Sequence, residues 1–537
     1  MAEPVLEVRD LCVCLKTGAK IVEHVSFAVT PGQTVCLVGE SGSGKSMIAN
    51  AVMDLMPSSQ LAVTGGAIRF HGEDLRPLGD KAMRDLRGKR VSMIFQDPMS
   101  ALNPARRIRT QFDEVFSAHG IEPEGGREAR MLELLELTHL PNPPRILDAF
   151  PFELSGGQRQ RVMISMAMAL NPDLLIADEP TTALDVTTQA QILRLIAELQ
   201  RTFSTAVLFI THDFGVVAEI ADDVVVLRHG RIVEHSPLET ILRAPREDYT
   251  KTLIEAVPQW NPRAEGLEAP ALIEATSLQK VFKGSFAALD DVSVALRAGE
   301  TLGIVGESGS GKSTFAKCLI GLEEPDGGKI VVQGTEITTL PPVQRRQKRH
   351  MMQMVFQDPT AALNPRHTIG RTLADVLRAN GCARGDLRAR ALGLLDDVKL
   401  DGKFVDRFPH ELSGGQRQRV CIARALAANP EVLIADEALS ALDVSVQKQM
   451  LALFAELKEQ RNLAILFITH DLRVAAEICD QVVVMRHGGV VARGTPEAVL
   501  TGSRHAYVEE LLAAIPGQDW FPAGTGPAAP VAAKSAI

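Results

Sequence analysis

Short apolar runs alternate with longer stretches of helical periodicity along the whole chain, and each apolar run ends in small or polar residues. The clearest runs are "TVCLVGE" (34–40), "LLIAD" (174–178), "AVLFITH" (206–212), "TLGIVGE" (301–307), "VLIAD" (432–436) and "AILFITH" (464–470). Unbroken apolar runs that alternate with helices are typical of a parallel sheet covered by helices on both faces. The pattern therefore predicts an α/β fold.

The chain carries this pattern twice. "GESGSGKS" begins at Gly39 and again at Gly306, and "LSGGQRQRV" begins at Leu154 and again at Leu412, an offset of 258 residues (412 − 154). "ADE" and "THD" recur at the same offset. Solenoid repeats have far shorter periods. The sequence therefore predicts two copies of one domain, each with a parallel-sheet core and, between "FQDP" and "LSGGQ", a helical subdomain.

Composition divides the chain in the same way. Its 537 residues suit two to four domains, and 45% of them are apolar, enough for buried cores. We expect a first domain at 1–262, a linker at 263–271 that is rich in Pro, Gly and charge, and a second domain at 272–517. The Pro/Ala/Gly-rich segment 518–537 is expected to be disordered.

Charge and cysteine usage narrow the class of protein. A net charge of −9, with only two Trp and two Tyr, argues against a protein built to coat nucleic acid. The seven Cys show no metal-ligand spacing, and we expect them, Cys12 and Cys14 included, to be buried small hydrophobes in a reducing compartment. Without a signal-peptide pattern or 18 continuous apolar residues, the chain is expected to be cytoplasmic.

Both glycine-rich stretches match G-x-x-x-x-G-K-[ST], in which small residues let backbone N–H groups surround phosphates where a helix begins. The lysine of this pattern reaches the β- and γ-phosphates, and the next residue ligates Mg²⁺. Two matches at equivalent repeat positions exclude chance. The predicted ATP-binding residues are Gly39, Glu40, Ser41, Gly42, Ser43, Gly44, Lys45 and Ser46, and Gly306, Glu307, Ser308, Gly309, Ser310, Gly311, Lys312, Ser313 and Thr314.

An acidic pair ends one apolar run in each copy, in "LLIADEP" and "VLIADEA". Such a pair after a strand is by itself usually a solvated cap, but a phosphate loop in the same module favours a role in catalysis. Asp178 and Asp436 are predicted to support Mg²⁺, directly or through water. Glu179 and Glu437 are predicted to polarise the attacking water.

Two further polar residues follow β-type runs in each copy. They are Gln96 and Gln357 in "FQDP", and His212 and His470 in "THD". A polar residue at the carboxyl end of a parallel strand points into the ligand crevice. A lone His there could be structural, but its recurrence at a fixed distance beyond the acidic pair favours a γ-phosphate sensor.

"LSGGQ" adds a second anion-binding element to each copy, because Ser-Gly-Gly before a helical segment exposes backbone N–H groups. A second anion site is redundant within one copy, and it makes sense if it closes over the nucleotide of the other copy. The predicted capping residues are Ser155, Gly156, Gly157 and Gln158, and Ser413, Gly414, Gly415 and Gln416.

The order of P-loop, Gln loop, LSGGQ, Asp-Glu, "TALD" or "SALD" and switch His resembles ABC-type ATPase domains over essentially the whole chain. The resemblance implies two tandem P-loop NTPase domains that pair head to tail with two ATP between them. It implies ATP and Mg²⁺ as cofactors, with the metal held by Ser46, Gln96 and Asp178, and by Ser313, Gln357 and Asp436. The Lys45 site would be completed by Ser413, and the Lys312 site by Ser155.

Several shorter sequence segments resemble those of one group of importers. "FQDPMSALNP", "FQDPTAALNPR" and the tails "EDYTKTLIEAVP" (247–258) and "HAYVEELLAAIP" (505–516) are similar to ATP-binding subunits that serve dipeptide, oligopeptide, glutathione and nickel import. In length the chain resembles the fused ATPase of microcin C and peptide importers. The resemblance implies import of peptides or peptide-like compounds through two membrane-spanning permease subunits, at the cytoplasmic face of the inner membrane, with a substrate-binding protein. Some relatives carry a Cys cluster for an iron–sulfur centre after this tail, and its absence predicts no cluster here.

One residue departs from the family pattern. The family stacks adenine on an aromatic ring near the first strands, and Phe282 matches in the second copy. Leu15 stands at the equivalent place in the first copy, and the lost stacking weakens that site by about 1 kcal/mol.

The alternative function is a soluble ABC ATPase that acts on nucleic acid or the ribosome. The basic run "RRQKRH" (345–350) could suggest nucleic acid, but its place before the Gln loop favours a solvated helix face. Such proteins usually carry a long charged linker, zinc modules or a coiled coil, and this sequence has a short junction instead. We therefore expect no nucleic-acid partner.

Overall fold

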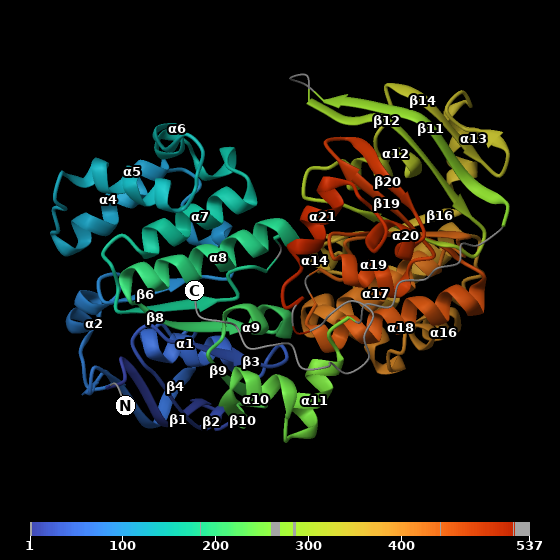
Figure 1. The fold of residues 1–537 in the computed structure, drawn as a ribbon. Coiled ribbons are helices and arrows are strands. Elements are labelled where there is room, and N and C mark those ends of the chain that lie inside the picture. Colours follow the sequence, from blue (N-terminus) through green and yellow to red (C-terminus); the bar gives the residue numbers. More distant parts are fainter. Residues whose placement is uncertain are drawn as a thin grey trace.

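The computed structural model describes residues 3–182, 184–258, 269–282, 286–440, 442–518 and 520. Two similar halves lie side by side (Figure 1), a first copy from β1 to α11 and a second copy from β11 to α21. Of the predicted linker, 263–268 lies outside the described residues, and β11 begins at Ala271. Of the predicted tail, 519 and 521–537 also lie outside them.

The core of the first copy is a six-stranded sheet in the order β10-β9-β3-β8-β7-β6. Its strands are β3 (Thr34–Val38), β6 (Val91–Ile94), β7 (Leu174–Asp178), β8 (Ala206–Thr211), β9 (Asp223–Arg228) and β10 (Arg231–Pro237). All pair in parallel except β10, which is antiparallel to β9. Every residue of β3, β7 and β8 is buried, which is why these strands read as unbroken apolar runs.

The second copy repeats this sheet in the order β16-β17-β18-β13-β19-β20. Its strands are β13 (Thr301–Val305), β16 (Met352–Val355), β17 (Val432–Asp436), β18 (Ala464–Thr469), β19 (Gln481–Arg486) and β20 (Gly489–Gly494). Only β20 runs antiparallel to its neighbour. The two parallel-sheet cores confirm the predicted α/β class.

Each copy also contains an antiparallel sheet that the sequence pattern did not predict. In the first copy its order is β2-β1-β4-β5, and in the second it is β12-β11-β14-β15. The strands are β1 (Leu6–Leu15), β2 (Lys20–Val29), β4 (Leu61–Phe70), β5 (Glu73–Asp74), β11 (Ala271–Phe282), β12 (Phe286–Arg297), β14 (Gly327–Val332) and β15 (Thr335–Glu336). In Figure 1 these sheets lie at the bottom of the first copy and at the top of the second. They carry Leu15 and Phe282.

The antiparallel sheet corrects the expectation for two cysteines. Cys36, Cys318, Cys421 and Cys479 are buried, but Cys12 and Cys14 in this sheet are only partly so, and the expectation is also wrong for Cys382, which is partly buried outside it. Residues two apart on a strand share a face, and here the face of β1 that packs on the core carries Val13 instead. The Cys14 thiol accepts a hydrogen bond from Thr64 Oγ1 at 3.3 Å.

Helices cover both sheets of each copy. In the first copy they are α1 (Lys45–Met53), α2 (Asp80–Leu86), α3 (Pro98–Ala101), α4 (Ile108–His119), α5 (Arg127–Leu137), α6 (Pro143–Asp148), α7 (Gly156–Ala167), α8 (Val186–Phe203), α9 (Phe214–Ile220), α10 (Leu238–Arg243) and α11 (Asp248–Glu255). Helices α4 to α7 contact one another and form the predicted helical subdomain, which lies at the upper left of Figure 1.

The second copy repeats this helical layer. Its helices are α12 (Lys312–Ile320), α13 (Pro342–Arg349), α14 (Pro359–Ala362), α15 (Ile369–Ala379), α16 (Leu387–Asp397), α17 (Gly414–Leu426), α18 (Val444–Arg461), α19 (Leu472–Ile478), α20 (Pro496–Leu500) and α21 (Ala506–Ala513). The basic run lies on α13, which buries none of its residues, as predicted. Among the described residues, no helix combines the length and hydropathy needed to cross a membrane.

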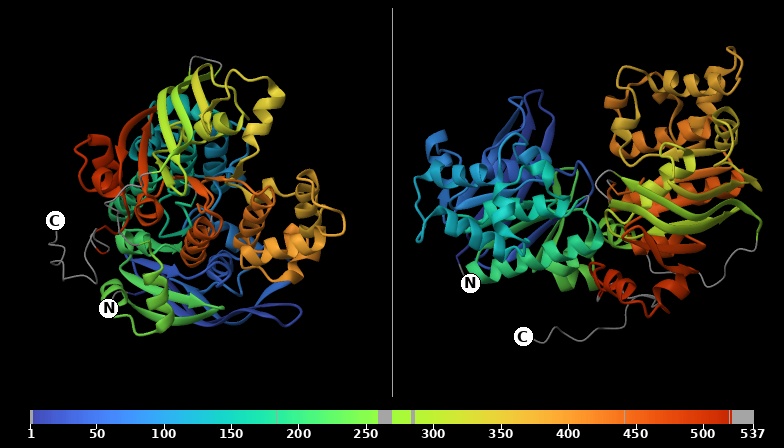
Figure 2. Two further views of the ribbon diagram at one scale, coloured as in Figure 1. Left: turned by 90° about the vertical axis from the view of Figure 1, so that its right-hand side faces the viewer. Right: turned by 90° about the horizontal axis from the view of Figure 1, so that it is seen from above.

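The two copies pack against each other (Figure 2). Val186, the first residue of α8, is 6% exposed and belongs to a hydrophobic core formed otherwise by the second copy, including Tyr507 and Leu511. Helix α21 contacts α8, and Lys448 Nζ on α18 donates to the carbonyl of Glu255 at the end of α11 at 2.9 Å. The start of one long helix and the tail helix of the other copy therefore share an interface.

Candidate nucleotide sites

Each P-loop links a buried strand to a helix. β3 ends at Val38 and α1 begins at Lys45, while β13 ends at Val305 and α12 begins at Lys312. Gly311, directly before α12, has φ 103°. A Cβ there would lie 2.3 Å from the Ala288 carbonyl oxygen, so both conformation and space require glycine.

Each P-loop encloses its lysine. Lys45 is 5% exposed, and its Nζ donates to the carbonyls of Gly39 at 2.6 Å and Glu40 at 2.9 Å. Lys312 makes the same two bonds, at 2.8 Å to Gly306 and 2.7 Å to Glu307. Burial lowers the pKa of both lysines, against the opposing effect of nearby carboxylates. Phosphate oxygens would supply the negative charge that stabilises a buried ammonium.

The residue after each lysine meets a carboxylate. Ser46 Oγ donates to Asp178 Oδ1 at 2.9 Å, and Ser313 Oγ donates to Asp436 Oδ1 at 2.8 Å. Burial raises the pKa of Asp178 to about 6, against the hydrogen bond from Ser46, and it also raises the pKa of Asp436. A hydroxyl and a carboxylate are oxygen ligands of the kind that Mg²⁺ shares with phosphate and water.

Two observations test whether the loops fit a Mg²⁺-nucleotide. Ser43 Oγ and Ser310 Oγ, one in each loop, are buried without a hydrogen-bond partner among the described residues. A buried polar atom without a partner is costly, and a phosphate at the loop would offer one. The described residues hold no group of three or more His, Cys, Asp and Glu that could bind a metal alone. One serine hydroxyl and one aspartate carboxylate in each copy suit an ion that takes its other ligands from phosphate and water.

The acidic residues that follow the Asp have an unusual backbone. Glu179 has φ 46° and Glu437 has φ 47°, in the left-handed region. Their N–H groups donate across the sheet to the carbonyls of Ile210 and Ile468, each at 3.0 Å. Strain of this kind gathers at functional sites, where the surrounding structure holds it.

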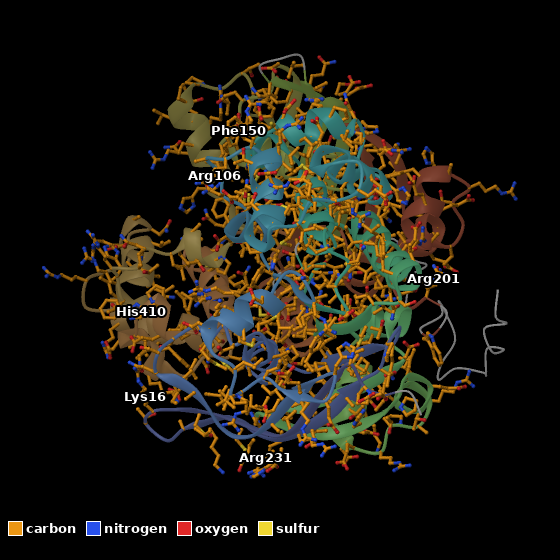
Figure 3. The ribbon with its side chains drawn as sticks, turned by 90° about the vertical axis from the view of Figure 1, so that its left-hand side faces the viewer. Lys16, Arg106, Phe150, Arg201, Arg231 and His410 are labelled. Atoms are coloured by element: carbon orange, nitrogen blue, oxygen red, sulfur yellow. The ribbon has the colours of Figure 1, made fainter. Side chains whose placement is uncertain are left out.

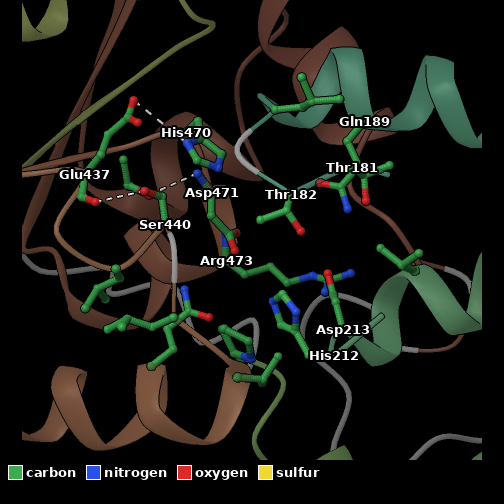
Figure 4. Close-up of a pocket in the computed structure, with 18 of the residues that line it drawn as sticks. Thr181, Thr182, Gln189, His212, Asp213, Glu437, Ser440, His470, Asp471 and Arg473 are labelled. Carbon is green, nitrogen blue, oxygen red and sulfur yellow. Dashed lines mark hydrogen bonds and ion pairs between the residues drawn. The ribbon is translucent and has the colours of Figure 1, made fainter. Parts of the chain in front are cut away.

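Both copies bring the predicted Gln and His to this Glu. Gln96 Nε2 donates to Glu179 Oε2 at 3.0 Å, and His212 Nδ1 lies 3.2 Å from Glu179 Oε1. In the second copy the Gln357–Glu437 bond is 2.8 Å long. His470 Nδ1 lies 3.8 Å from Glu437 Oε1, a looser ion pair that Figure 4 shows.

The electrostatics of the first site favour an ionised Glu. Burial raises the pKa of Glu179, but the hydrogen bond from His212 and the charges of His212 and Lys45 lower it further, so the net pKa is lowered. Burial lowers the pKa of His212, but the Glu179 bond raises it overall. A carboxylate held in this way can accept a proton from water.

A pocket at the second site joins the predicted adenine and phosphate residues. Phe282, Lys312, Ser313, Gln357, Glu437 and His470 line it, together with Asp185 of the first copy. In the first copy Leu15 lies at the end of β1, opposite Leu61. Ser155 and Ser413 cap α7 and α17 in reciprocal bonds with Gln158 and Gln416. Ser155, Gly156 and Gly157 do not line this pocket. In this conformation the first copy therefore contributes Asp185 to the second site, but not Ser155.

Comparison with known proteins identifies the family. The ABC transporter family model matches residues 22–182 and 289–440, which together cover more than half of the chain. The chain belongs to the ABC transporter family. The oligopeptide/dipeptide transporter C-terminal region matches residues 233–285, which include the first tail. The predicted family is therefore confirmed, and the chain is an ABC-type ATPase.

Three similar ABC proteins align with nearly the whole chain. A peptidoglycan transport ATP-binding protein of Agrobacterium fabrum is 41% identical, over 95% of this chain and 96% of that protein. An oligopeptide transport ATP-binding protein of Mycobacterium tuberculosis is 39% identical, over 96% and 99%. A glutathione import ATP-binding protein of Shigella dysenteriae is 42% identical, over 92% and 86%. The solved ADP- and Pi-bound dimer of the cassette MJ0796 is 29% identical over 42% of this chain, with a TM-score of 0.39.

The second nucleotide site of this ABC ATPase is contacted from the first copy. Thr187 Oγ1, in the first turn of α8, donates to Glu307 Oε1 of the P-loop at 2.6 Å. Asp185 caps the same helix and accepts from Thr188 N–H at 3.0 Å. Between the copies lies a further pocket lined by both switch histidines, by Glu437 and by Arg473 (Figure 4).

Three further residues that contact these sites were not predicted from the sequence. The hydroxyl of Tyr249 accepts from Glu40 N–H at 3.3 Å, and that of Tyr507 accepts from Glu307 N–H at 3.1 Å. A signal was present, because the chain has two Tyr and they lie 258 residues apart (507 − 249), the offset of the other motifs. Thr182 was also missed, and its Oγ1 donates to Glu179 Oε2 at 3.1 Å.

Proposed function

We propose that this ABC ATPase powers the import of peptides or peptide-like compounds through a membrane transporter, as a fused pair of nucleotide-binding domains. The observation that carries the proposal is that one chain holds two complete sets of P-loop Lys, Ser-Asp pair and Gln-Glu-His cluster. The relatives named for oligopeptide and glutathione transport support the substrate class.

Each site has the residues for Mg²⁺-dependent hydrolysis of ATP. Bound Mg²⁺ would be held by Ser46 with Asp178, and by Ser313 with Asp436, and would neutralise charge on the phosphates. The buried lysines bind the β- and γ-phosphates. Glu179 and Glu437 orient and polarise the attacking water, while the Gln and His beside them hold each Glu in place.

We propose further that each site is completed by the opposite copy. Ser413, Gly414 and Gly415 would cap ATP at Lys45, and Ser155, Gly156 and Gly157 would cap ATP at Lys312. The Thr187–Glu307 bond and the presence of Asp185 in the second pocket support this pairing. Closure that brings α7 and α17 over the nucleotides would couple ATP binding to motion of the two copies.

The partners that fit this function are two permease subunits at the cytoplasmic face of the inner membrane, which a substrate-binding protein serves. Exposed apolar side chains near the Gln loop of the first copy support a docking surface, with Phe95 at 42%, Met99 at 44% and Phe152 at 62% exposure. Large exposed apolar side chains are typical of interaction sites when they gather on neighbouring elements. Here they lie just after β6, on α3 and just before α7, and both β6 and α3 contact α7.

The equivalent surface of the second copy differs in chemistry. His410 stands where the first copy has Phe152, and Thr360 stands where it has Met99. Phe150 stacks on Phe152, with centroids 5.5 Å apart, and Figure 3 shows Phe150 and His410 on the two helical subdomains. Two unlike docking surfaces support a pair of non-identical permease subunits.

Replacing both glutamates tests the catalytic assignment. Glu179→Gln with Glu437→Gln should lower ATP turnover by about 10²-fold or more, because the general base is lost, and should trap ATP-bound protein. Glu124→Gln with Glu459→Gln, two exposed glutamates far from the P-loops in sequence, is the matched control. Undiminished turnover in the double catalytic variant would rule the assignment out. Co-purification with nucleic acid or ribosomes, instead of two hydrophobic membrane subunits, would overturn the import proposal.

A further inference from the structure

The tail of each copy reaches back to that copy's own P-loop. Tyr249 lies on α11 and Tyr507 on α21, and each hydroxyl accepts a hydrogen bond from the second residue of the "GESGSGKS" loop. The carbonyl of the same residue accepts a hydrogen bond from the P-loop lysine, at 2.9 Å for Glu40 and 2.7 Å for Glu307. The backbone of this one residue therefore connects the tyrosine to the P-loop lysine. Its N–H binds the tyrosine hydroxyl, and its carbonyl binds the lysine ammonium.

The environment of the tyrosines keeps the hydroxyl neutral and in place. Arg486 lies over the Tyr507 ring at 4.3 Å, and Arg228 lies over the Tyr249 ring at 4.6 Å. Tyr507 is 1% exposed. Burial raises the pKa of Tyr507 to about 12 and also raises the pKa of Tyr249, so both hydroxyls stay protonated near neutral pH. A neutral hydroxyl is a good acceptor for a backbone N–H.

The second P-loop is also held from the opposite copy. Thr187 binds the side chain of Glu307, while Tyr507 binds its backbone. Helix α21 packs against α8, and Val186 shares a hydrophobic core with Tyr507. At the first site the corresponding contact between copies is the bond from Lys448 to the end of α11. The tail helices thus contact both their own P-loop and the first turns of the opposite long helix.

We propose that Tyr249 and Tyr507 are positioning residues, which hold each P-loop in its phosphate-binding form and link it to the opposite copy. A P-loop binds phosphate with backbone N–H groups, so its affinity depends on a fixed backbone. Packing and the arginine contact need only the aromatic ring. The hydroxyl is needed for the bond to the loop, and both copies keep it although the residue two positions earlier is Glu247 in the first copy and His505 in the second. The inference rests on the proposed binding of ATP at these loops.

Single-site backgrounds test this role. Lys45→Ala disables the first site, so that a fluorescent ATP analogue with Mg²⁺ reports binding at the second. In this background Tyr507→Phe should raise the Kd of the second site by about two- to tenfold, because the net free energy of one hydrogen bond is lost. Tyr249→Phe is the matched control and should leave the Kd of the second site unchanged, because its hydroxyl serves the other loop. In the Lys312→Ala background the two Phe variants should exchange effects.

The crossed pattern separates positioning from general stabilisation. If both Phe variants weaken binding equally in both backgrounds, the tails are merely structural and the proposal is wrong. It is equally wrong if neither Phe variant changes the Kd. Failure of the proposed nucleotide sites looks different, because Lys45→Ala with Lys312→Ala would then bind the analogue as well as the unmodified protein. Thermal unfolding of each variant checks that all remain folded.

Discussion

Leu15 and Phe282 differ in their capacity to stack on an adenine ring, although they stand at matching places in the two copies. Phe282 is 38% exposed and lines the pocket that also contains Lys312. Leu15 ends β1 and offers no ring. Because the remaining chemistry of the two sites is so similar, this pair isolates the contribution of stacking.

A ring placed at Leu15 should strengthen the first site. Leu15→Tyr should tighten binding of the ATP analogue in the Lys312→Ala background by about 1 kcal/mol, or about fivefold. Leu15→Met keeps the volume without a ring and should have little effect. Phe282→Ala should weaken the second site in the Lys45→Ala background. Equal binding by Leu15→Tyr and Leu15→Met would refute stacking at this position.

Single-residue chemistry was largely predictable from the sequence. The lysines, the Ser-Asp pairs and the Gln-Glu-His clusters meet as expected, since the carboxyl ends of parallel strands share one edge of a sheet. The backbone of Glu179 and Glu437, with φ near 46°, could not be predicted, because no residue type in "ADE" requires it. It depends on the hydrogen bond to the neighbouring strand.

Among the elements, the antiparallel sheets were missed because their pairing is irregular. In β1 the register shifts between Val8 and Leu11, and Asp10 there has φ 52°. A bulge inserts a residue and moves the following side chains to the other face, so strict alternation of apolar and polar residues is lost from the sequence. The parallel strands were predictable because burial on both faces needs no alternation.

A close approach of backbone in the second antiparallel sheet gives an element-scale prediction. Gly328 in β14 has φ 84°, and a Cβ there would lie 2.3 Å from the Ser277 carbonyl oxygen of β11. Gly334 has a similar φ of 72° with nothing within 4 Å of such a Cβ. Gly334→Ala should therefore cost about 1 kcal/mol of unfolding free energy, and Gly328→Ala at least about 2 kcal/mol.

Urea unfolding followed by circular dichroism measures both costs. Gly328→Ala should also weaken ATP binding at the second site, because β11 carries Phe282 and pairs with β14. Gly334→Ala serves as the control for left-handed backbone without a clash. Equal midpoints for the two variants would show that the approach of β11 to β14 relaxes at no cost.

At the scale of the whole molecule, the two copies are fused but not equivalent. Arg473 on α19 stands where the first copy has Gly215, and its guanidinium donates to the carbonyl of Pro516. Gly517 N–H donates to Glu219 Oε1 on α9 at 2.8 Å. The end of the second copy is thus held against the first copy. The two copies are therefore asymmetric, although their motifs repeat.

The crossed pairing of sites is tested in the Glu179→Gln, Glu437→Gln background, where ATP stays trapped. Lys45→Ala with Ser413→Arg damages one composite site twice, so the site of Lys312 and Ser155 should still occlude ATP. Lys45→Ala with Ser155→Arg damages both sites, and occluded ATP should fall towards zero. Counting bound radiolabelled ATP distinguishes the variants. Retention by the Lys45/Ser155 variant, with loss by the Lys45/Ser413 variant, would contradict the crossed arrangement.

The sequence by itself determined the two copies, the P-loops, the acidic pairs and the family, because each motif is contiguous in the chain and recurs at a matching place. Only the tertiary structure decided that Tyr507 meets Glu307 across 200 residues, and that Thr187 meets Glu307 across 120. These contacts depend on how α21 and α8 pack at the interface of the copies. Packing of this kind arises from shape and burial over distant segments, which local patterns do not encode.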